Sequence, residues 1–317
     1  MFKRILIPLD GSDLAERVLP HAIALAKSNQ AEFFLLRVID PIGAETRHRI
    51  VDPLDWNFRM VEADGYLKGI AARLAEQGLD VQSEVREGRA ADIIIEYAHE
   101  HKMDLVLLSS HGKSGISGWN VSSVVQKVIL RIRTSVMLIR AYQPVSAEEY
   151  LSYHKILLPL DGSQRAETVL GIASQLARSQ DAELLVVHII RPPDMPRQKP
   201  LSHEDIQLAD QIIERNRLEA QAYLEELRSR FDIPLQTSLY VGQNVASELR
   251  RIIDELGADL VLLTSHGSTG DTGLPYGSLV ITTIAYGTTP LLIFQDMAPE
   301  NIQPTQAEEI SREQGRR

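Results

Sequence analysis

Two loops rich in glycine and serine carry the residue types that proteins use to bind phosphate. The first loop, residues 110–123, reads SHGKSGISGWNVSS, and the second, residues 265–278, reads SHGSTGDTGLPYGS. An apolar run precedes each loop, and apolar residues at helical spacing follow it. Backbone N–H groups at a helix N-terminus lack internal partners and lie at the positive end of the helix dipole. Because small residues let a phosphate approach that backbone, the pattern indicates an anion-binding loop in each copy.

The glycine spacing separates these loops from two widespread phosphate motifs. The pattern GxxxxGK[ST] occurs nowhere, and Gly112, Gly115 and Gly118 form GxxGxxG rather than the dinucleotide pattern GxGxxG. Taken alone this signal is weak. A simpler interpretation stays open, in which Ser122 or Ser278 only caps the helix that follows the loop.

The two loops belong to a duplication of a whole domain. The segment FKRILIPLDGSDLAERVL at 2–19 returns as HKILLPLDGSQRAETVL at 154–170. Asp10 thus corresponds to Asp161, and His111 corresponds to His266. A repeat of about 150 residues is far longer than the unit of a solenoid, so the chain holds two similar domains.

Each copy alternates apolar strands with amphipathic helices. In the first copy we expect strands near 4–9, 33–39, 81–85, 105–109 and 136–140, and helices near 14–25, 58–77, 90–101 and 122–132. In the second copy we expect strands near 155–160, 183–190, 235–241, 259–264 and 291–295, and helices near 164–179, 205–230, 245–256 and 278–286. The alternation predicts an α/β fold made of two tandem, doubly wound, five-stranded parallel-sheet domains. Ligands of such sheets bind beyond the carboxyl ends of the strands, where the Asp-Gly-Ser turns and both loops fall.

We expect domain 1 at residues 1–143 and domain 2 at residues 154–296, joined by a linker that contains Pro144. Residues 297–317 contain two prolines and many charged residues, which predicts a polar, poorly ordered tail.

Composition narrows the class of protein. The net charge of −10 argues against a nucleic-acid binder, which needs a basic face. The absence of cysteine excludes disulfides and thiolate chemistry. The start of the chain turns polar after Leu9, too early for a signal-peptide core, and no apolar run reaches the ~18 residues of a membrane helix. We therefore expect a cytoplasmic protein with no membrane contact.

With the repeat and the ILxPLDGS start, the sequence resembles the universal stress protein family in its tandem form, over about residues 1–140 and 154–296. The resemblance implies an adenine nucleotide alpha hydrolase-like fold with strand order 3-2-1-4-5. ATP-binding members carry G-x-x-G, nine residues, then G-[S/T]. The first copy keeps this spacing with Ser109, Gly112, Ser122 and Ser123, and the second copy keeps it with Thr264, Gly267, Gly277 and Ser278.

The two copies depart from that pattern in different ways. The first glycine is replaced in both copies, and Ser122 replaces the third glycine in the first copy only. Gly277 permits a close phosphate approach that the side chain of Ser122 would crowd. Lys113 supplies a cation to the first loop, whereas the second loop has Asp271 and no Lys or Arg. We therefore expect ATP at one copy at least, and the second copy is slightly favoured.

Further contacts follow from the resemblance. Asp10 and Asp161 are implied to contact the nucleotide near adenosine, and the alternative is an Asx turn that starts the first helix. A carboxylate beside phosphates also favours a shared Mg²⁺. The backbones of Val38 and Ile189 are implied to meet adenine. The last strands of the two copies, near 136–140 and 291–295, are implied to pack together as an intramolecular pseudo-dimer, and a homodimer of chains is a further possibility.

The remaining residues of note favour packing over catalysis. His111 and His266 have no second metal ligand at a suitable spacing in their loops and no visible Ser/His/Asp arrangement, so we expect structural roles. Trp119 and Tyr276 precede the last helices and are expected to pack or to cover the loops.

The sequence thus predicts an ATP-binding regulatory module without catalytic residues, whose nucleotide-ordered loop is recognised by an unknown protein partner. Two alternatives remain. One is a slow ATPase or phosphotransfer enzyme, for which Lys113 and the loop serines are the only candidates. The other is a stress protein that has lost nucleotide and acts by protein contacts.

Overall fold

The computed structural model describes residues 2–26, 30–40, 53–113, 115, 121–142, 151–194, 202–231, 234–267 and 275–296. The elements of the first half are β1 Arg4–Pro8, α1 Asp13–Glu16, α2 Leu19–Ala26, β2 Glu32–Ile39, α3 Pro53–Glu76, β3 Asp80–Glu87, α4 Ala90–Glu100, β4 Leu105–Ser109, α5 Ser123–Ile129 and β5 Ser135–Ile139. Those of the second half are β6 Lys155–Pro159, α6 Gln164–Glu167, α7 Leu170–Gln180, β7 Glu183–Ile190, α8 His203–Ser229, β8 Leu235–Val241, α9 Val245–Leu256, β9 Leu260–Thr264, α10 Ser278–Tyr286 and β10 Leu291–Phe294.

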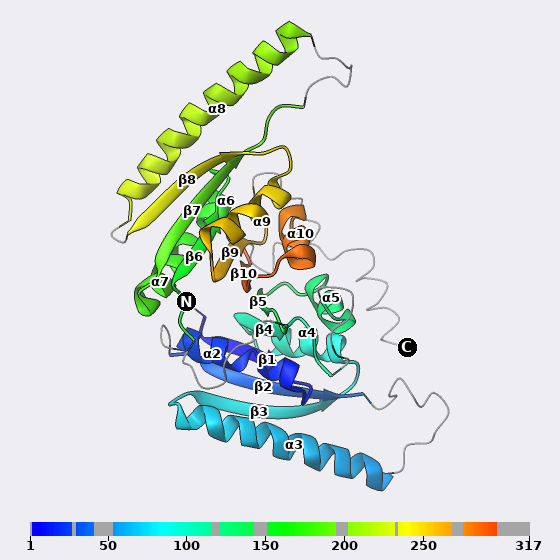
Figure 1. The fold of residues 1–317 in the computed structure, drawn as a ribbon. Coiled ribbons are helices and arrows are strands. Elements are labelled where there is room, and N and C mark those ends of the chain that lie inside the picture. The colour runs from blue at the N-terminus through cyan, green and yellow to red at the C-terminus, as the bar shows by residue number, and fades with distance from the viewer. Residues whose placement is uncertain are drawn as a thin grey trace.

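All ten strands join one sheet in the order β3-β2-β1-β4-β5-β10-β9-β6-β7-β8. Each half therefore has the predicted order 3-2-1-4-5, and its strands pair in parallel. The edge strands β3 and β8 are covered by the long helices α3 and α8, which lie at opposite ends of the molecule (Figure 1). The order reverses between β1 and β4, and between β6 and β9, as in other doubly wound sheets.

Alternate strand residues divide the core into two layers. Ile5 and Phe33 face the layer that contains residues of α2 and α3, and Leu6 and Phe34 face the layer that contains residues of α4 and α5. The second half repeats the arrangement with α7 and α8 on one face and α9 and α10 on the other. Because both faces of the sheet are buried at its centre, the inner strands are almost continuously apolar, whereas the edge strands β3 and β8 are partly exposed and carry polar residues.

The first helix of each half, predicted as one piece, is divided in two. In the first half α1 ends at Glu16 and α2 begins at Leu19, and in the second half α6 and α7 are separated at the same place. Across the break the backbone bonds from residue i to i−3, as in Val18 N to Ala15 O at 3.4 Å. Pro20 lacks an N–H, but the second half breaks identically with Gly171 there. The break therefore belongs to the shared fold.

The two halves meet where their last strands pair. β5 and β10 are antiparallel, with Val136 opposite Ile293 and Leu138 opposite Leu291, so the contact predicted between these strands is confirmed. Arg140 extends from the end of β5 and donates to the carbonyls of Thr283 and Ile284 at 3.0 Å each. Burial lowers the pKa of Arg140 to about 10. A guanidinium at the C-terminus of α10 complements the helix dipole, which ties the two halves together.

Parts of two predictions lie outside the described residues: the linker at 143–150 and the tail at 297–317. Among the described helices, none combines the length and apolar character needed to cross a bilayer.

Candidate functional site

The Asp-Gly-Ser turn ends the first strand of each half and has the same geometry in both. Asp10 Oδ1 accepts from Ser12 N at 3.0 Å and from Ser12 Oγ at 2.6 Å, and Ser12 Oγ in turn accepts from Ala15 N. Asp161 and Ser163 repeat these contacts at the same distances. Gly11 has φ +81°, a conformation that favours glycine. The Asx turn is thus present in both halves. A nucleotide contact by the same aspartates stays a prediction.

The second carboxylate oxygen of Asp10 reaches across to the loop after β4. Asp10 Oδ2 accepts from Lys113 N at 2.5 Å. A Cβ atom on Gly112 would collide with this oxygen, and a Cβ atom on Gly267 would lie 2.5 Å from Asp161 Oδ2. Glycine is therefore required at both positions, because the aspartate carboxylate occupies the place of a side chain. Sequence reasoning missed this reason and explained the glycines by the close approach of a phosphate.

A backbone hydrogen bond closes the base of each loop. Ser122 N donates to Ser110 O at 2.7 Å, and Gly277 N donates to Ser265 O at 2.7 Å. Within the two loops that these bonds close, residues 114, 116–120 and 268–274 lie outside the described part, and Trp119 is among them. Tyr276 is buried and donates to Thr134 O of the first half at 3.2 Å, so it packs rather than covering the loop. We call this edge of each half, with its turn, its loop and the end of its second strand, the rim.

The helix that follows each loop starts differently in the two halves. Ser122 Oγ accepts from Val125 N at 3.3 Å and caps α5, whereas Gly277 provides no side-chain cap for α10. A Cβ atom on Gly277 would meet Ser265 O at 3.5 Å, an ordinary contact. In the second half a serine would therefore fit this backbone, and the hydroxyl of Ser122 occupies a helix donor. The crowding of a phosphate by Ser122 stays a prediction. Ser123 and Ser278 begin the two helices and are exposed.

The second strand of each half extends past the end of the first. The last bond between them runs from Leu9 N to Leu36 O at 2.8 Å, matched by Leu160 N to Val187 O at 2.9 Å. Ladder bonds alternate sides along a strand, so two residues further the N–H and C=O of Val38 and Ile189 face the space beyond the first strand. These backbone groups can pair with the donor–acceptor edge of a flat ligand.

Ser109 and Thr264, at the ends of β4 and β9, use their hydroxyls internally. Ser109 Oγ donates to Leu14 O at 2.6 Å, and Thr264 Oγ1 donates to His266 O at 2.8 Å. They hold the start of each loop, and the nucleotide contact predicted for them stays a prediction.

The two loop histidines are buried beside serines, and the second has an additional carboxylate. His111 Nδ1 lies 3.1 Å from Ser110 Oγ. His266 Nδ1 lies 3.1 Å from Ser265 Oγ and 2.9 Å from Asp296 Oδ1. Sequence reasoning found no Ser/His/Asp arrangement because Asp296 follows β10, although β10 ends beside β9 and that adjacency was the available signal. Both partners lie on the same ring nitrogen and Ser265 is fully buried, so the cluster lacks the geometry of a catalytic triad.

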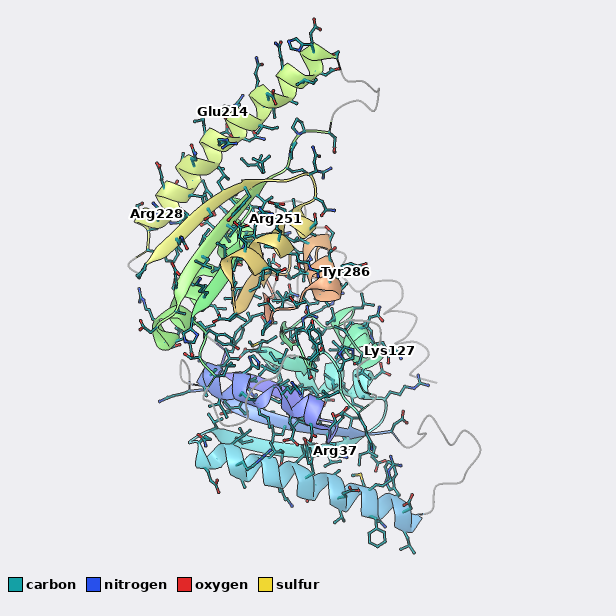
Figure 2. All side chains as sticks on the ribbon, viewed as in Figure 1. Arg37, Lys127, Glu214, Arg228, Arg251 and Tyr286 are labelled. Carbon is teal, nitrogen blue, oxygen red and sulfur yellow. The ribbon has the colours of Figure 1, made fainter. Side chains whose placement is uncertain are left out.

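The charge beside each Asp-Gly-Ser turn differs between the halves. Arg37 lies on β2 and is labelled in Figure 2. Its guanidinium lies against Gly11, where a Cβ atom would be 2.6 Å from its Nη1, and it stacks over Tyr66 at 5.0 Å from the ring centroid. Among the described residues Arg37 forms no ion pair with a carboxylate. The second half has His188 at this position, and burial lowers its pKa, so that ring is neutral at pH 7.

A shared ion pair lies behind this position in both halves. Arg73 Nη2 donates to Glu16 at 2.8 Å, and Arg230 Nη2 donates to Glu167 at 2.9 Å. Tyr66 also donates to Glu16, at 3.0 Å. Because these charges are paired in both halves, Arg37 joins Lys113 as a cation that distinguishes the first rim from the second.

The described residues include no group of three His, Cys, Asp or Glu side chains placed to hold a metal ion. Among the described residues each Asp-Gly-Ser turn supplies one aspartate, which already accepts hydrogen bonds from its own turn, and the further carboxylate at the second loop, Asp296, contacts His266. Mg²⁺ often binds with one carboxylate, several waters and the phosphates of a nucleotide. These donors fit a Mg²⁺ that arrives with a nucleotide rather than a protein cage.

Comparison with known proteins gives a consistent result. A family model of the universal stress protein family matches residues 1–140 and 152–295. Universal stress protein MJ0531 of Methanocaldococcus jannaschii is 30% identical over 145 residues, which are 44% of this chain and 83% of that protein. Universal stress protein YxiE of Bacillus subtilis is 28% identical over 149 residues, 44% of this chain and 100% of that protein. A crystal structure of a universal stress protein from Archaeoglobus fulgidus has a TM-score of 0.63 at 17% identity, and the match covers 93% of this chain and 98% of that one.

Proposed function

The chain belongs to the universal stress protein family, and from this membership we propose that it is a regulatory module that binds ATP at its rims. One observation carries the proposal. The carboxylate of Asp10 joins the turn after β1 to the loop after β4, across the point where strand order reverses. Open α/β sheets bind their ligands at that point.

Each group at the rim has a chemical role toward adenosine and its phosphates. Val38 and Ile189 would pair with the adenine edge through their backbones. Asp10 and Asp161 retain acceptor capacity for the ribose hydroxyls. The helix starts at Ser123 and Ser278 would donate to phosphate, with Lys113 adding a cation in the first half. Mg²⁺ would enter with the phosphates and neutralise part of their charge.

The regulatory step is conformational in this proposal. A triphosphate bound at the helix start contacts the loop that the closing backbone bond encloses. Its presence therefore changes the surface that this loop offers. A protein partner of the stress response reads that surface in the cytoplasm. Such a module needs binding and orientation, and it needs no general base.

Thermal unfolding with and without Mg-ATP tests the proposal on the full chain. Ligand at 100 times its Kd is expected to stabilise the protein by about 2.7 kcal/mol. A Gly112→Ala/Gly267→Ala variant displaces both aspartates and is expected to lose the shift. The matched control is Gly65→Ala/Gly69→Ala in α3, where a Cβ atom meets nothing within 4 Å.

Three results would decide against ATP-dependent regulation at the rims. If millimolar ATP does not raise the unfolding temperature of the wild type, the protein does not bind ATP, which favours a module that acts by protein contacts. An equal shift in the Gly112→Ala/Gly267→Ala variant moves the site elsewhere. Steady release of ADP from the wild type, lost in Lys113→Ala, favours the ATPase.

A further inference from the structure

A cavity of about 220 Å³ lies between α9 and α10, on the side of the second half away from the loop of its rim. Its apolar lining comes from Leu249 and Ile253 of α9 and from Val261 of β9. Ser247 and four threonines supply hydroxyl groups: Thr282, Thr283, Thr288 and Thr289. Tyr286 stands at the outside of α10, with 63% of its surface exposed (Figure 2). The cavity is therefore apolar within and open at one side.

The equivalent place in the first half is bridged by an ion pair. Asp92 of α4 pairs with Arg131 at the end of α5. The repeat aligns these two residues with Ser247 and Tyr286, which carry no charge. It also aligns the buried Ile132 with Gly287, where Thr283 O and Arg140 Nη2 lie 2.5 and 3.1 Å from the place of a Cβ atom. Three substitutions between the copies thus accompany the opening of the second half.

Three hydroxyl groups of the cavity, all on α9 and α10, have already used their donors. Ser247 Oγ donates to Asn244 O at 3.0 Å, Thr282 Oγ1 to Ser278 O at 2.8 Å, and Thr283 Oγ1 to Leu279 O at 2.8 Å. A hydroxyl has one donor and two acceptor lone pairs, so these three retain acceptor capacity only. The charged Arg250 and Asp254 belong to the lining but are exposed, at the mouth.

We propose that this cavity binds a small, flat aromatic molecule that carries one N–H or O–H donor, of the indole or phenol class. The volume supports a fused bicycle, because a dry cavity of about 150 Å³ accepts benzene. The apolar lining suits an aromatic ring, and the spent hydroxyls select a ligand that donates. The site uses the C-terminal half of α10, whereas the rim uses its N-terminus at Gly277 and Ser278.

Indole and indene test the proposal, since they share shape and differ at the N–H. With the full chain, calorimetry and saturation-transfer NMR are expected to show saturable indole binding at least five times tighter than indene. Of the three hydroxyls that of Thr283 is the part-buried one, so we assign the acceptor to it. Thr283→Val keeps the shape and removes this acceptor, so its indole affinity should fall to the level of indene. The matched control is Thr168→Val, whose exposed hydroxyl donates to Arg165 O far along the chain from the cavity and which should bind like the wild type.

A second variant installs the ion pair of the first half. Ser247→Asp/Tyr286→Arg is expected to weaken indole at least tenfold while far-ultraviolet circular dichroism stays unchanged. If that variant does not fold, Thr283→Val alone decides. Equal affinity for indole and indene, unaltered binding in a folded Ser247→Asp/Tyr286→Arg variant, displacement of indole by ATP, or no saturation at low millimolar indole each overturns the proposal.

Discussion

The two rims of this molecule share a backbone and differ in the side chains that fill it. Both have the Asx turn, the glycine that admits an aspartate, and the bond that closes the loop. The positions that differ include Arg37 against His188, Lys113 against Ser268, Ser122 against Gly277 and Ala141 against Asp296. The groups that shape the backbone of the rim are thus the same in both halves. The side chains that set the charge of the rim and its hydrogen-bond donors differ. The comparison indicates two sites of one shape with different preferences.

The surface where the halves meet shows the same divergence. His21 Nδ1 lies 2.6 Å from the hydroxyl of Tyr153, and both side chains are buried. The repeat aligns these residues with Ile172 and Phe2, which are apolar. One of two related positions is therefore polar and titratable, and the other is not.

The largest expected effect concerns this polar pair. Burial lowers the pKa of His21 to about 4, below the value of 6.5 in an unfolded chain. Between these values the unfolded state binds the extra proton, so stability should fall as pH drops from 6.5 to 4, by roughly 3 kcal/mol in total. Above pH 6.5 His21 is neutral in both the folded and the unfolded state, so this loss of stability is absent. Urea unfolding at several pH values measures it.

The variant His21→Ile/Tyr153→Phe copies the residues of the other half and should remove this component of the pH dependence. If the variant keeps the slope of the wild type between pH 6.5 and 4, His21 is not the group responsible. The comparison of the two positions would then be purely steric.

The next effect compares the two aspartate contacts. Gly112→Ala forces Asp10 away from Lys113 N, and Gly267→Ala displaces Asp161. A hydrogen bond to a charged group contributes about 1.5–3 kcal/mol, so ATP affinity at the altered rim should fall about 10- to 100-fold. Calorimetry should report one tight site in each single variant and none in the double variant. Retention of two tight sites in both single variants contradicts the assigned contacts.

Much of this frame could be predicted from sequence because it depends on local patterns. The strands, the repeat and the position of Asp10 at the end of β1 follow from apolar runs and turn residues. The order 3-2-1-4-5 and the contact between β5 and β10 came from the family resemblance. The rest depends on residues distant in the chain, such as the pairing of Asp296 with His266. Nothing in the short-range pattern around Gly112 indicates that a carboxylate 102 positions earlier occupies its missing side chain.

The charge difference at the rims predicts a smaller effect on ligand preference. Arg37→His should lower ATP affinity at the first rim about five- to tenfold, because a partly exposed cation near phosphate contributes on the order of 1 kcal/mol. His188→Arg should raise ATP affinity at the second rim by a similar factor. Adenosine, which has no phosphate, is the control ligand and should bind both variants like the wild type. A parallel change in adenosine affinity would show that Arg37 acts through shape rather than charge.

The smallest expected effect is an opposite change in the stability of a helix and in the ATP affinity of the rim at its start. Gly277→Ser should cap α10 as Ser122 caps α5, and serine exceeds glycine as a cap by only a few tenths of a kcal/mol. The same hydroxyl would engage an N–H that a phosphate at the second rim would otherwise use. Unfolding should therefore report a slight gain in stability, while calorimetry reports weaker ATP binding at the second rim. Ser122→Gly should produce the opposite pair of changes at the first rim. If stability and ATP affinity change in the same direction in either variant, the phosphate does not bind at the helix start.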